Sequence, residues 1–245
     1  MIQKEIYGTR SIIEAIKAGK EITKIFLQRG SASNALTQEL EQLIKKEQIS
    51  VAYVPVQKLD RLTKKNHQGA YATISPIRFM DLETLVERSL NASQTPLLLI
   101  LDQLTDARNF GAIIRTAACT GVQGIIIQKS GGAPVNADTV KTSAGGLFHV
   151  PICRVDHIKD ALFYLQGSGI KTIAATEKAS QTVYENDLTA PLALIMGSEG
   201  KGVSHGVLKT ADELVKLPMT GPIESLNVSV ACGAFLYEIV RQRLS

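Results

Sequence analysis

Residues 96–102 read PLLLILD, a continuous apolar run that begins at a proline and ends at an aspartate. Three further runs share this pattern: GIIIQ at 124–128, KTIAAT at 171–176 and PLALIMG at 191–197. Apolar residues at every position, rather than at alternate positions, are typical of strands that helices cover on both faces. The pattern therefore predicts an α/β domain with a mostly parallel sheet over residues 96–245.

The first 78 residues predict a second, smaller α/β domain. Their apolar periodicity indicates helices over 9–18, 33–46 and near 58–63, and strands at 22–28, at 51–55 and around Tyr71–Ser75. Residues 79–95, FMDLETLVERSLNASQT, read as a short acidic helix followed by a polar stretch, which is typical of a joint between domains. We therefore predict domains at 1–78 and 96–245, with a linker at 79–95.

The charge of the chain is unevenly distributed. Its formal net charge is +4, and residues 1–78 contain 13 Lys and Arg against 7 Asp and Glu, whereas residues 95–245 contain 13 of each. An excess of basic residues in the first domain suits contact with the phosphates of a nucleic acid. On charge alone, a solvated basic face explains the excess equally well.

Several classes of protein are disfavoured by the composition. No apolar run approaches the roughly 20 residues that cross a bilayer, and the N-terminus MIQKEIYGTR lacks the features of a secretory signal, so we expect a cytoplasmic protein without membrane contact. The three cysteines are widely separated, as in reduced packing residues, and no histidine stands at metal-ligand spacing. We expect no metal site.

Ligands of open α/β sheets bind beyond the carboxyl ends of the strands, and three loops there contain unusual residues. The first, DQLTDARNFGAIIR at 102–115, places Asn109 near the start of a helix and Arg115 within it. An arginine on an otherwise apolar helix is costly to bury unless it is paired. Locally, the two residues read as a helix-capping asparagine and a salt-bridged arginine.

The second loop, MGSEGKGVS at 196–204, contains three glycines around Glu199. The glycines allow a ligand to approach the backbone closely, although a plain glycine turn is an equally good reading. The loop matches neither GxxxxGK[ST] nor GxGxxG, which disfavours ATP, GTP and dinucleotide sites.

The third loop, LPMTGPIESLNVS at 217–229, presents Glu224, Ser225 and Asn227 together before the apolar C-terminal helix. Ser and Asn are good helix N-caps, so capping alone could explain the last two residues. A functional role needs support from the other loops.

Taken together, NFGAIIR (109–115), MGSEGKG (196–202) and LPMTGPIESLNVSVA (217–231) resemble the three motifs of the SpoU (TrmH-type) RNA ribose 2′-O-methyltransferases, within the SPOUT superfamily. IYGTRSIIEAI (6–16) and NHQGAYA (66–72) resemble the small, L30e-like substrate-binding domain of the same family. The two-domain arrangement is most similar to the RlmB-type branch, which methylates a guanosine ribose in 23S ribosomal RNA.

The resemblance implies a catalytic domain with a deep trefoil knot, an exception to the usual rule against knotted chains. It implies S-adenosylmethionine as the cosubstrate, bound mostly through backbone groups at positions that match Gly197, Leu217 and Leu226. Met219 and Gly221 belong to the same expected cofactor site. The resemblance also implies a homodimer.

By the same resemblance, Arg115 contacts the RNA and assists removal of the 2′-hydroxyl proton. Because a guanidinium has a pKa above about 12, we expect Arg115 to orient the phosphate and stabilise the developing alkoxide rather than act as the base. Asn109, Glu199, Ser225 and Asn227 are expected to form a hydrogen-bonded frame that holds Arg115 and the ribose. In the family's dimers Arg115 would serve the partner's cofactor site.

Three alternatives stand beside this reading. A tRNA ribose methyltransferase would carry the same motifs, because the motifs report the reaction rather than the RNA. A noncatalytic RNA-binding relative would be expected to lack Arg115, Asn109 or Glu199, and all three are present. A dinucleotide-dependent enzyme would carry GxGxxG after the strand at 97–101, where DQLTDARNFG stands instead.

Overall fold

The computed structural model describes residues 5–17, 19–30, 34–75 and 77–244. The chain divides into two compact units, the first formed mainly by residues 1–78 and the second by residues 79–134 and 138–245. Each unit has its own sheet and its own core, and each is described by itself.

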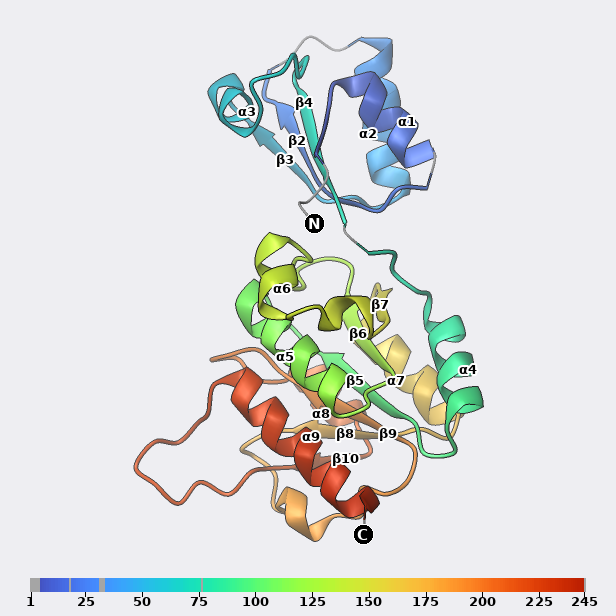
Figure 1. Cartoon of the computed structure of the whole chain (residues 1–245), viewed down its shortest axis with the longest axis vertical. Coiled ribbons are helices and arrows are strands. Elements are labelled where there is room, and N and C mark those ends of the chain that lie inside the picture. The colour runs from blue at the N-terminus through green and yellow to red at the C-terminus, as the bar shows by residue number, and fades with distance from the viewer. Residues whose placement is uncertain (1–4, 18, 31–33, 76, 245) are drawn as a thin grey trace. The chain divides into compact units, whose positions relative to one another are not determined.

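The first unit is a four-stranded mixed sheet with helices on both faces (Figure 1). Its strand order is β1-β4-β2-β3, in which β2 and β3 are parallel and β4 is antiparallel to β1 and β2. Its elements are β1 (Glu5–Tyr7), α1 (Thr9–Lys17), β2 (Ile22–Gln28), α2 (Ala35–Lys46), β3 (Val51–Val54), α3 (Val56–Leu62) and β4 (Ala70–Ile74).

Two helices form the core of this unit on one face of the sheet. Apolar residues of α1 and α2, among them Ile12 and Leu40, pack against β2 and β4, while Leu59 of α3 packs beneath Tyr71 on the other face. Asn34 begins α2 because its side chain accepts a hydrogen bond from the backbone N–H of Thr37 (2.9 Å). The predicted α/β alternation is confirmed, although residues 18 and 33 lie outside the described residues.

The second unit contains a six-stranded, all-parallel sheet with the order β10-β8-β9-β5-β6-β7. Every residue of the central strands β5 and β9 is buried, as the continuous apolar runs predict. Its strands are β5 (Leu97–Leu101), β6 (Gly124–Gln128), β7 (Ile152–Val155), β8 (Lys171–Ala175), β9 (Leu192–Met196) and β10 (Glu213–Val215). Its helices are α4 (Leu82–Ala92), α5 (Ala107–Cys119), α6 (Ala137–Thr142), η1 (Gly146–Phe148), α7 (Ile158–Gly167), η2 (Val183–Glu185), α8 (His205–Thr210) and α9 (Val228–Leu244).

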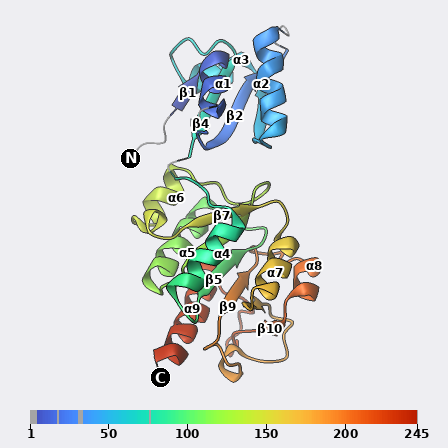
Figure 2. The same cartoon turned by 90° about the vertical axis from the view of Figure 1, so that its right-hand side faces the viewer.

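Helices cover both faces of this sheet (Figures 1 and 2). Helices α4, α7 and α8 share one core with the sheet, and α5 and α9 pack against each other on the other face. The predicted mostly parallel sheet is thus confirmed, and the trefoil knot stays a prediction of the resemblance.

Residues 79–95, predicted as a short acidic helix and a polar linker, include a helix that packs on the second unit. They contain α4, which Asp81 begins by accepting a hydrogen bond from the N–H of Thr84, and whose Leu85 and Val86 are only 1% and 2% exposed. Leu85 occupies the space above Gly124 of β6, where an added Cβ would lie 2.3 Å from its Cδ1. In the sequence, the acidic residues of this segment made it look solvent-exposed, although its buried residues pack on the second unit.

No helix within the described residues has both the length and the apolar content to cross a membrane.

Candidate active site

The three loops singled out in the sequence meet at the carboxyl ends of β5, β9 and β10, as the topology requires. The second and third of these loops line a cavity of about 700 Å³, which we call the main cavity. Its wall contains residues from the segments 175–178, 196–202, 216–219 and 224–228 and from the first turns of α9. All these residues belong to the second unit.

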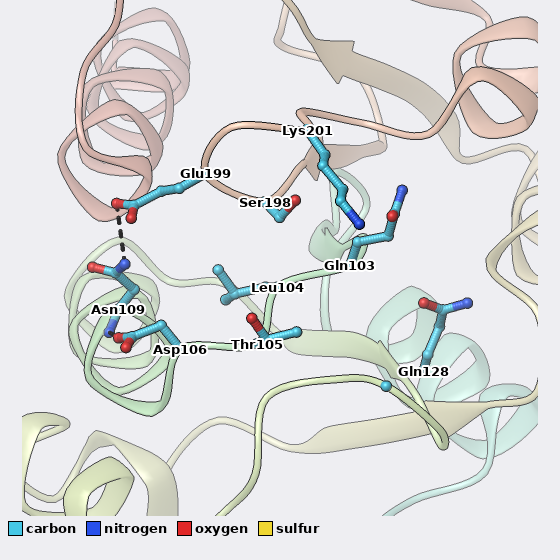
Figure 3. A pocket seen from close by; sticks show the side chains of 10 residues that line it. Gln103, Leu104, Thr105, Asp106, Asn109, Gln128, Ser198, Glu199 and Lys201 are labelled. Carbon is cyan, nitrogen blue, oxygen red and sulfur yellow. Dashed lines mark hydrogen bonds between the residues drawn. The ribbon is translucent and has the colours of Figure 1, made fainter.

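Three polar side chains, Asn109, Glu199 and Asn227, form a hydrogen-bonded triangle beside the main cavity. The Nδ2 of Asn109 donates to Glu199 Oε1 (3.1 Å; Figure 3), and the Nδ2 of Asn227 donates both to Glu199 Oε1 and to Asn109 Oδ1 (3.1 Å). One residue comes from each of the three loops. The triangle therefore ties the three motifs together before any ligand binds.

The helices α5 and α9, next to which the triangle forms, are capped by two different residues. Asp106 is the N-cap of α5, because its Oδ1 accepts from the N–H groups of Arg108 and Asn109. The reading of Asn109 as the cap is therefore wrong, and its side chain is free to bind Glu199. Asn227 is both a member of the triangle and the cap of α9, because its Oδ1 accepts a hydrogen bond from the N–H of Ser229 at the start of that helix (3.0 Å).

The glycine-rich loop after β9 needs its glycines for close backbone packing. Ser198 and Gly202 exchange two backbone hydrogen bonds, and a Cβ on Gly197 would lie only 2.0 Å from the carbonyl carbon of Gly202. Gly200 and Gly202 have φ values of +81° and +66°, which favour glycine. The loop thereby holds Glu199 at a defined place on the cavity wall.

The expected cofactor residues fall mostly on the main cavity. Gly197, Leu217, Met219 and Leu226 line it, and Gly221 does not. Met219 and Leu226 are 41% and 44% exposed, which leaves apolar surface for a ligand to cover. Ser225 also lines the cavity, without a hydrogen-bond partner among the described residues.

Arg115 lies apart from this group. Six residues separate it from Asn109 on α5, which at about 3.6 residues per turn turns the two side chains about 120° apart. Its side chain is exposed, is absent from the wall of the main cavity, and makes no hydrogen bond or ion pair with the described residues. The expected frame forms without Arg115, and the expected salt bridge is absent within the described part of the chain.

Sequence reasoning missed two carboxylates that support the loops. Asp102, 2% exposed, follows β5 and accepts a hydrogen bond from the N–H of Ser204 after the glycine-rich loop (2.7 Å). Asp106 is the α5 cap described above. An aspartate directly after an apolar strand was the available signal for Asp102.

Cys232 on α9 is a buried free cysteine of the second unit. Burial raises the pKa of Cys232 on α9 to about 12, so its thiol stays protonated and unreactive at neutral pH. Among the residues that the structure describes, no three His, Cys, Asp or Glu side chains cluster so as to hold a metal ion.

Family models match both units of the chain. The SpoU rRNA Methylase family matches residues 96–237, and the family described as RNA 2′-O ribose methyltransferase substrate binding matches residues 6–80. The YacO protein of Bacillus subtilis (strain 168), assigned to the TrmH family of tRNA/rRNA methyltransferases, is 34% identical over 238 residues, covering 97% of this chain and 95% of that protein.

Solved structures show the same likeness. An AdoMet-bound rRNA methyltransferase from Sinorhizobium meliloti is 25% identical with a TM-score of 0.63, covering 98% of this chain and 88% of that one. A TrmH/SpoU tRNA modifying enzyme from A. aeolicus is 32% identical with a TM-score of 0.57, covering 66% of this chain and 84% of that one. The chain therefore belongs to the SpoU (TrmH-type) family of RNA 2′-O-ribose methyltransferases.

Proposed function

We propose that this protein methylates the 2′-hydroxyl of a guanosine ribose in 23S ribosomal RNA, with S-adenosylmethionine as the methyl donor. The observation that carries the proposal is the main cavity, together with the polar triangle that joins Asn109, Glu199 and Asn227 beside it. In this proposal the second unit is catalytic and the first unit, residues 1–78, binds RNA.

The residues of the main cavity fit S-adenosylmethionine. Its volume of about 700 Å³ lies within the range of small-molecule sites. The half-exposed side chains of Met219 and Leu226 suit the flat adenine ring, and Glu177 and Lys178 offer both charges to the amino-acid end of the molecule. When bound, the cosubstrate supplies a methyl group activated on a positively charged sulfur.

Glu199 is the residue best placed to receive the ribose hydroxyl. Its Oε1 is held by the two amides of the triangle, whereas Oε2 has no partner among the described residues. A carboxylate oxygen that is fixed in place but free of partners can accept a hydrogen bond from the 2′-hydroxyl and orient it for transfer. This role leaves Arg115 to pair with the neighbouring phosphate and with charge developing on the ribose oxygen.

A homodimer accounts for the position of Arg115. Val230, Tyr237 and Leu244 follow one another at seven-residue spacing along one side of α9 and are 56%, 57% and 83% exposed. Large exposed apolar side chains on one helix face suit an interface with a second copy. Because α5 packs beside α9, that interface would bring Arg115 near the partner's main cavity.

Ribosomal RNA is the favoured substrate because the similarity to an rRNA methyltransferase extends over nearly the whole chain. The rRNA methyltransferase from S. meliloti aligns with 98% of this chain, whereas the A. aeolicus tRNA enzyme aligns with 66% of it. The alignment with the rRNA enzyme thus includes the basic first unit as well as the second. A tRNA substrate is the second candidate, since the family of the B. subtilis relative includes tRNA and rRNA methyltransferases.

The test is methyl transfer from radiolabelled S-adenosylmethionine to unmodified 23S ribosomal RNA and to unmodified tRNA, with the labelled nucleotide mapped. We expect label on one guanosine 2′-oxygen of the ribosomal RNA, and none with Arg115→Ala. Label on tRNA alone would show that tRNA, and not ribosomal RNA, is the substrate. The absence of label on any RNA would refute the proposed methyltransferase activity.

A further inference from the structure

A second cavity adjoins the main one. It has a volume of about 530 Å³, and we call it the side cavity (Figure 3). Ser198, Glu199 and Lys201 line both cavities, and Asn109 belongs to the wall of the side cavity. The two cavities therefore meet at the polar triangle, where the hydroxyl to be methylated is proposed to lie.

Several polar side chains line the side cavity without partners among the described residues, and three of them are long enough to reach into it. Gln103, Gln128 and Lys201 make no side-chain hydrogen bond or ion pair with the described residues, and Figure 3 shows them around the cavity. Gln103 and Gln128 are half-buried. Half-buried amides without partners are available to a ligand that offers both donors and acceptors.

The backbone holds Gln103 in an unusual conformation. Its φ is +58°, in the left-handed region that non-glycine residues rarely adopt. The preceding residue, Asp102, is anchored on both sides, because its N–H donates to the carbonyl of Met196 (2.9 Å) and its carboxylate accepts from Ser204 (2.7 Å). The anchored neighbour supports a strained residue and so sets the direction of the Gln103 side chain.

The charges of the side cavity disfavour a polyphosphate and suit an uncharged heterocycle. Among the described residues that line it, Lys201 is the one cationic side chain, against the carboxylates of Asp106 and Glu199. Leu104, 3% exposed, provides an apolar part of the wall. The edge of a nucleobase offers hydrogen-bond donors and acceptors that two amides can match, and a single ammonium can pair with one phosphate.

We propose that the side cavity takes the base of the RNA nucleotide whose ribose is methylated. Gln103 and Gln128 hydrogen-bond with the base edge, and Lys201 pairs with the phosphate of the same nucleotide. The base in the side cavity and the methyl donor in the main cavity place the ribose between them, beside Glu199. This inference rests on the proposed function and adds to it the residues that select the base.

The test compares Gln103→Gly, Gln128→Ala and the control Gln181→Ala, whose exposed side chain lines neither cavity. Glycine at position 103 fits the positive φ, so this variant removes the amide without opposing the backbone. Each variant is assayed by calorimetric binding of S-adenosylmethionine, by thermal unfolding, and by kcat and KM on unmodified 23S ribosomal RNA. Base preference is measured on RNAs that carry each of the four bases at the methylated position.

We expect both cavity variants to bind S-adenosylmethionine like the wild type but to lose about tenfold or more in kcat/KM for RNA, mostly through KM. Their preference among the four bases should weaken, whereas Gln181→Ala should match the wild type. Unchanged kcat/KM and unchanged base preference in both variants would overturn this inference alone. A wild-type protein that methylates no RNA would overturn the proposed function and the inference with it.

Discussion

The side-chain amide of Asn109 donates a hydrogen bond to the carboxylate of Glu199, 90 residues further along the chain (3.1 Å). The same oxygen of Glu199 accepts from Asn227, so one carboxylate joins the loops that follow β5, β9 and β10. A single exposed carboxylate thus links three segments, two of which line the main cavity.

Two replacements of Glu199 should distinguish its role in holding these loops from the role of its negative charge in methyl transfer. Glu199→Ala removes the shared acceptor, and because hydrogen bonds to charged groups contribute about 1.5–3 kcal/mol, we expect methyl transfer to fall about 10–100-fold. Glu199→Gln keeps an acceptor oxygen and should hold the loops but transfer more slowly than the wild type. Steady-state kinetics with S-adenosylmethionine binding measured in parallel checks this, and wild-type rates in both variants would contradict it.

Two glycines of the expected cofactor site should respond differently to alanine. Gly197→Ala places a Cβ 2.0 Å from the backbone of Gly202, and overpacking of this kind costs about 1–3 kcal/mol, with loss of cofactor binding as the loop shifts. Gly221→Ala meets no atom within 4 Å and should bind S-adenosylmethionine like the wild type. Calorimetry and urea unfolding of both variants provide the comparison, and equal affinities would argue against this account of Gly197.

Arg115 should act across the proposed dimer. Arg115→Ala removes an exposed side chain and should change stability by no more than about 0.5 kcal/mol, while abolishing methyl transfer. When subunits of Arg115→Ala and Glu199→Ala are mixed and exchanged, a heterodimer contains one site with both residues intact, so activity should return. The matched variant Arg88→Ala, on α4, should retain activity throughout. A mixture that stays inactive would place Arg115 in its own subunit's site.

The proposed interface can be tested with two equally exposed tyrosines. Tyr237 on α9 and Tyr184 in η2 are both 57% exposed. Tyr237→Glu should shift the protein toward a monomer in sedimentation equilibrium, because it buries a charge in the interface, whereas Tyr184→Glu should leave the mass unchanged. Identical masses for both variants would remove α9 from the interface.

Stability should depend on pH through Asp212. Partial burial raises the pKa of this carboxyl, but hydrogen bonds from Thr172 and Gln166 outweigh it, so the pKa lies below 3.8. A lowered carboxyl pKa stabilises the fold above about pH 4 and loses that effect as pH falls through the folded-state value. The urea midpoint should therefore drop less between pH 5.5 and pH 3 in Asp212→Asn than in the wild type. An equal drop in both would contradict this role of Asp212.

The sequence predicted the core of this fold because burial on both faces leaves a simple pattern. The runs at 97–101 and 192–196 became the central strands, and the rule that ligands bind at carboxyl strand ends brought Asn109, Glu199 and Asn227 together. The three-residue strand β1 is too short for periodicity to identify.

Other features depend on tertiary packing that local sequence does not report. The direction of Arg115 follows from which side of α5 packs on the sheet and on α9, and residue type says nothing about that. The buried positions Leu85, Val86 and Ser89 have helical spacing, but the acidic residues among them suggested a solvated joint. The absence of a side chain on Gly124 leaves the space that Leu85 of α4 fills, and local sequence does not report that contact.

That contact between Leu85 and Gly124 determines where the catalytic unit can be cut from the chain. A protein shortened to begin at residue 96 would follow the match to the SpoU family model, yet it would lose α4 and uncover β6 where no side chain fills the gap. A protein that begins at Phe79 keeps the helix and the filled space. Residues 79–95 thus cover one face of the sheet, and any minimal methyltransferase made from this chain must retain them.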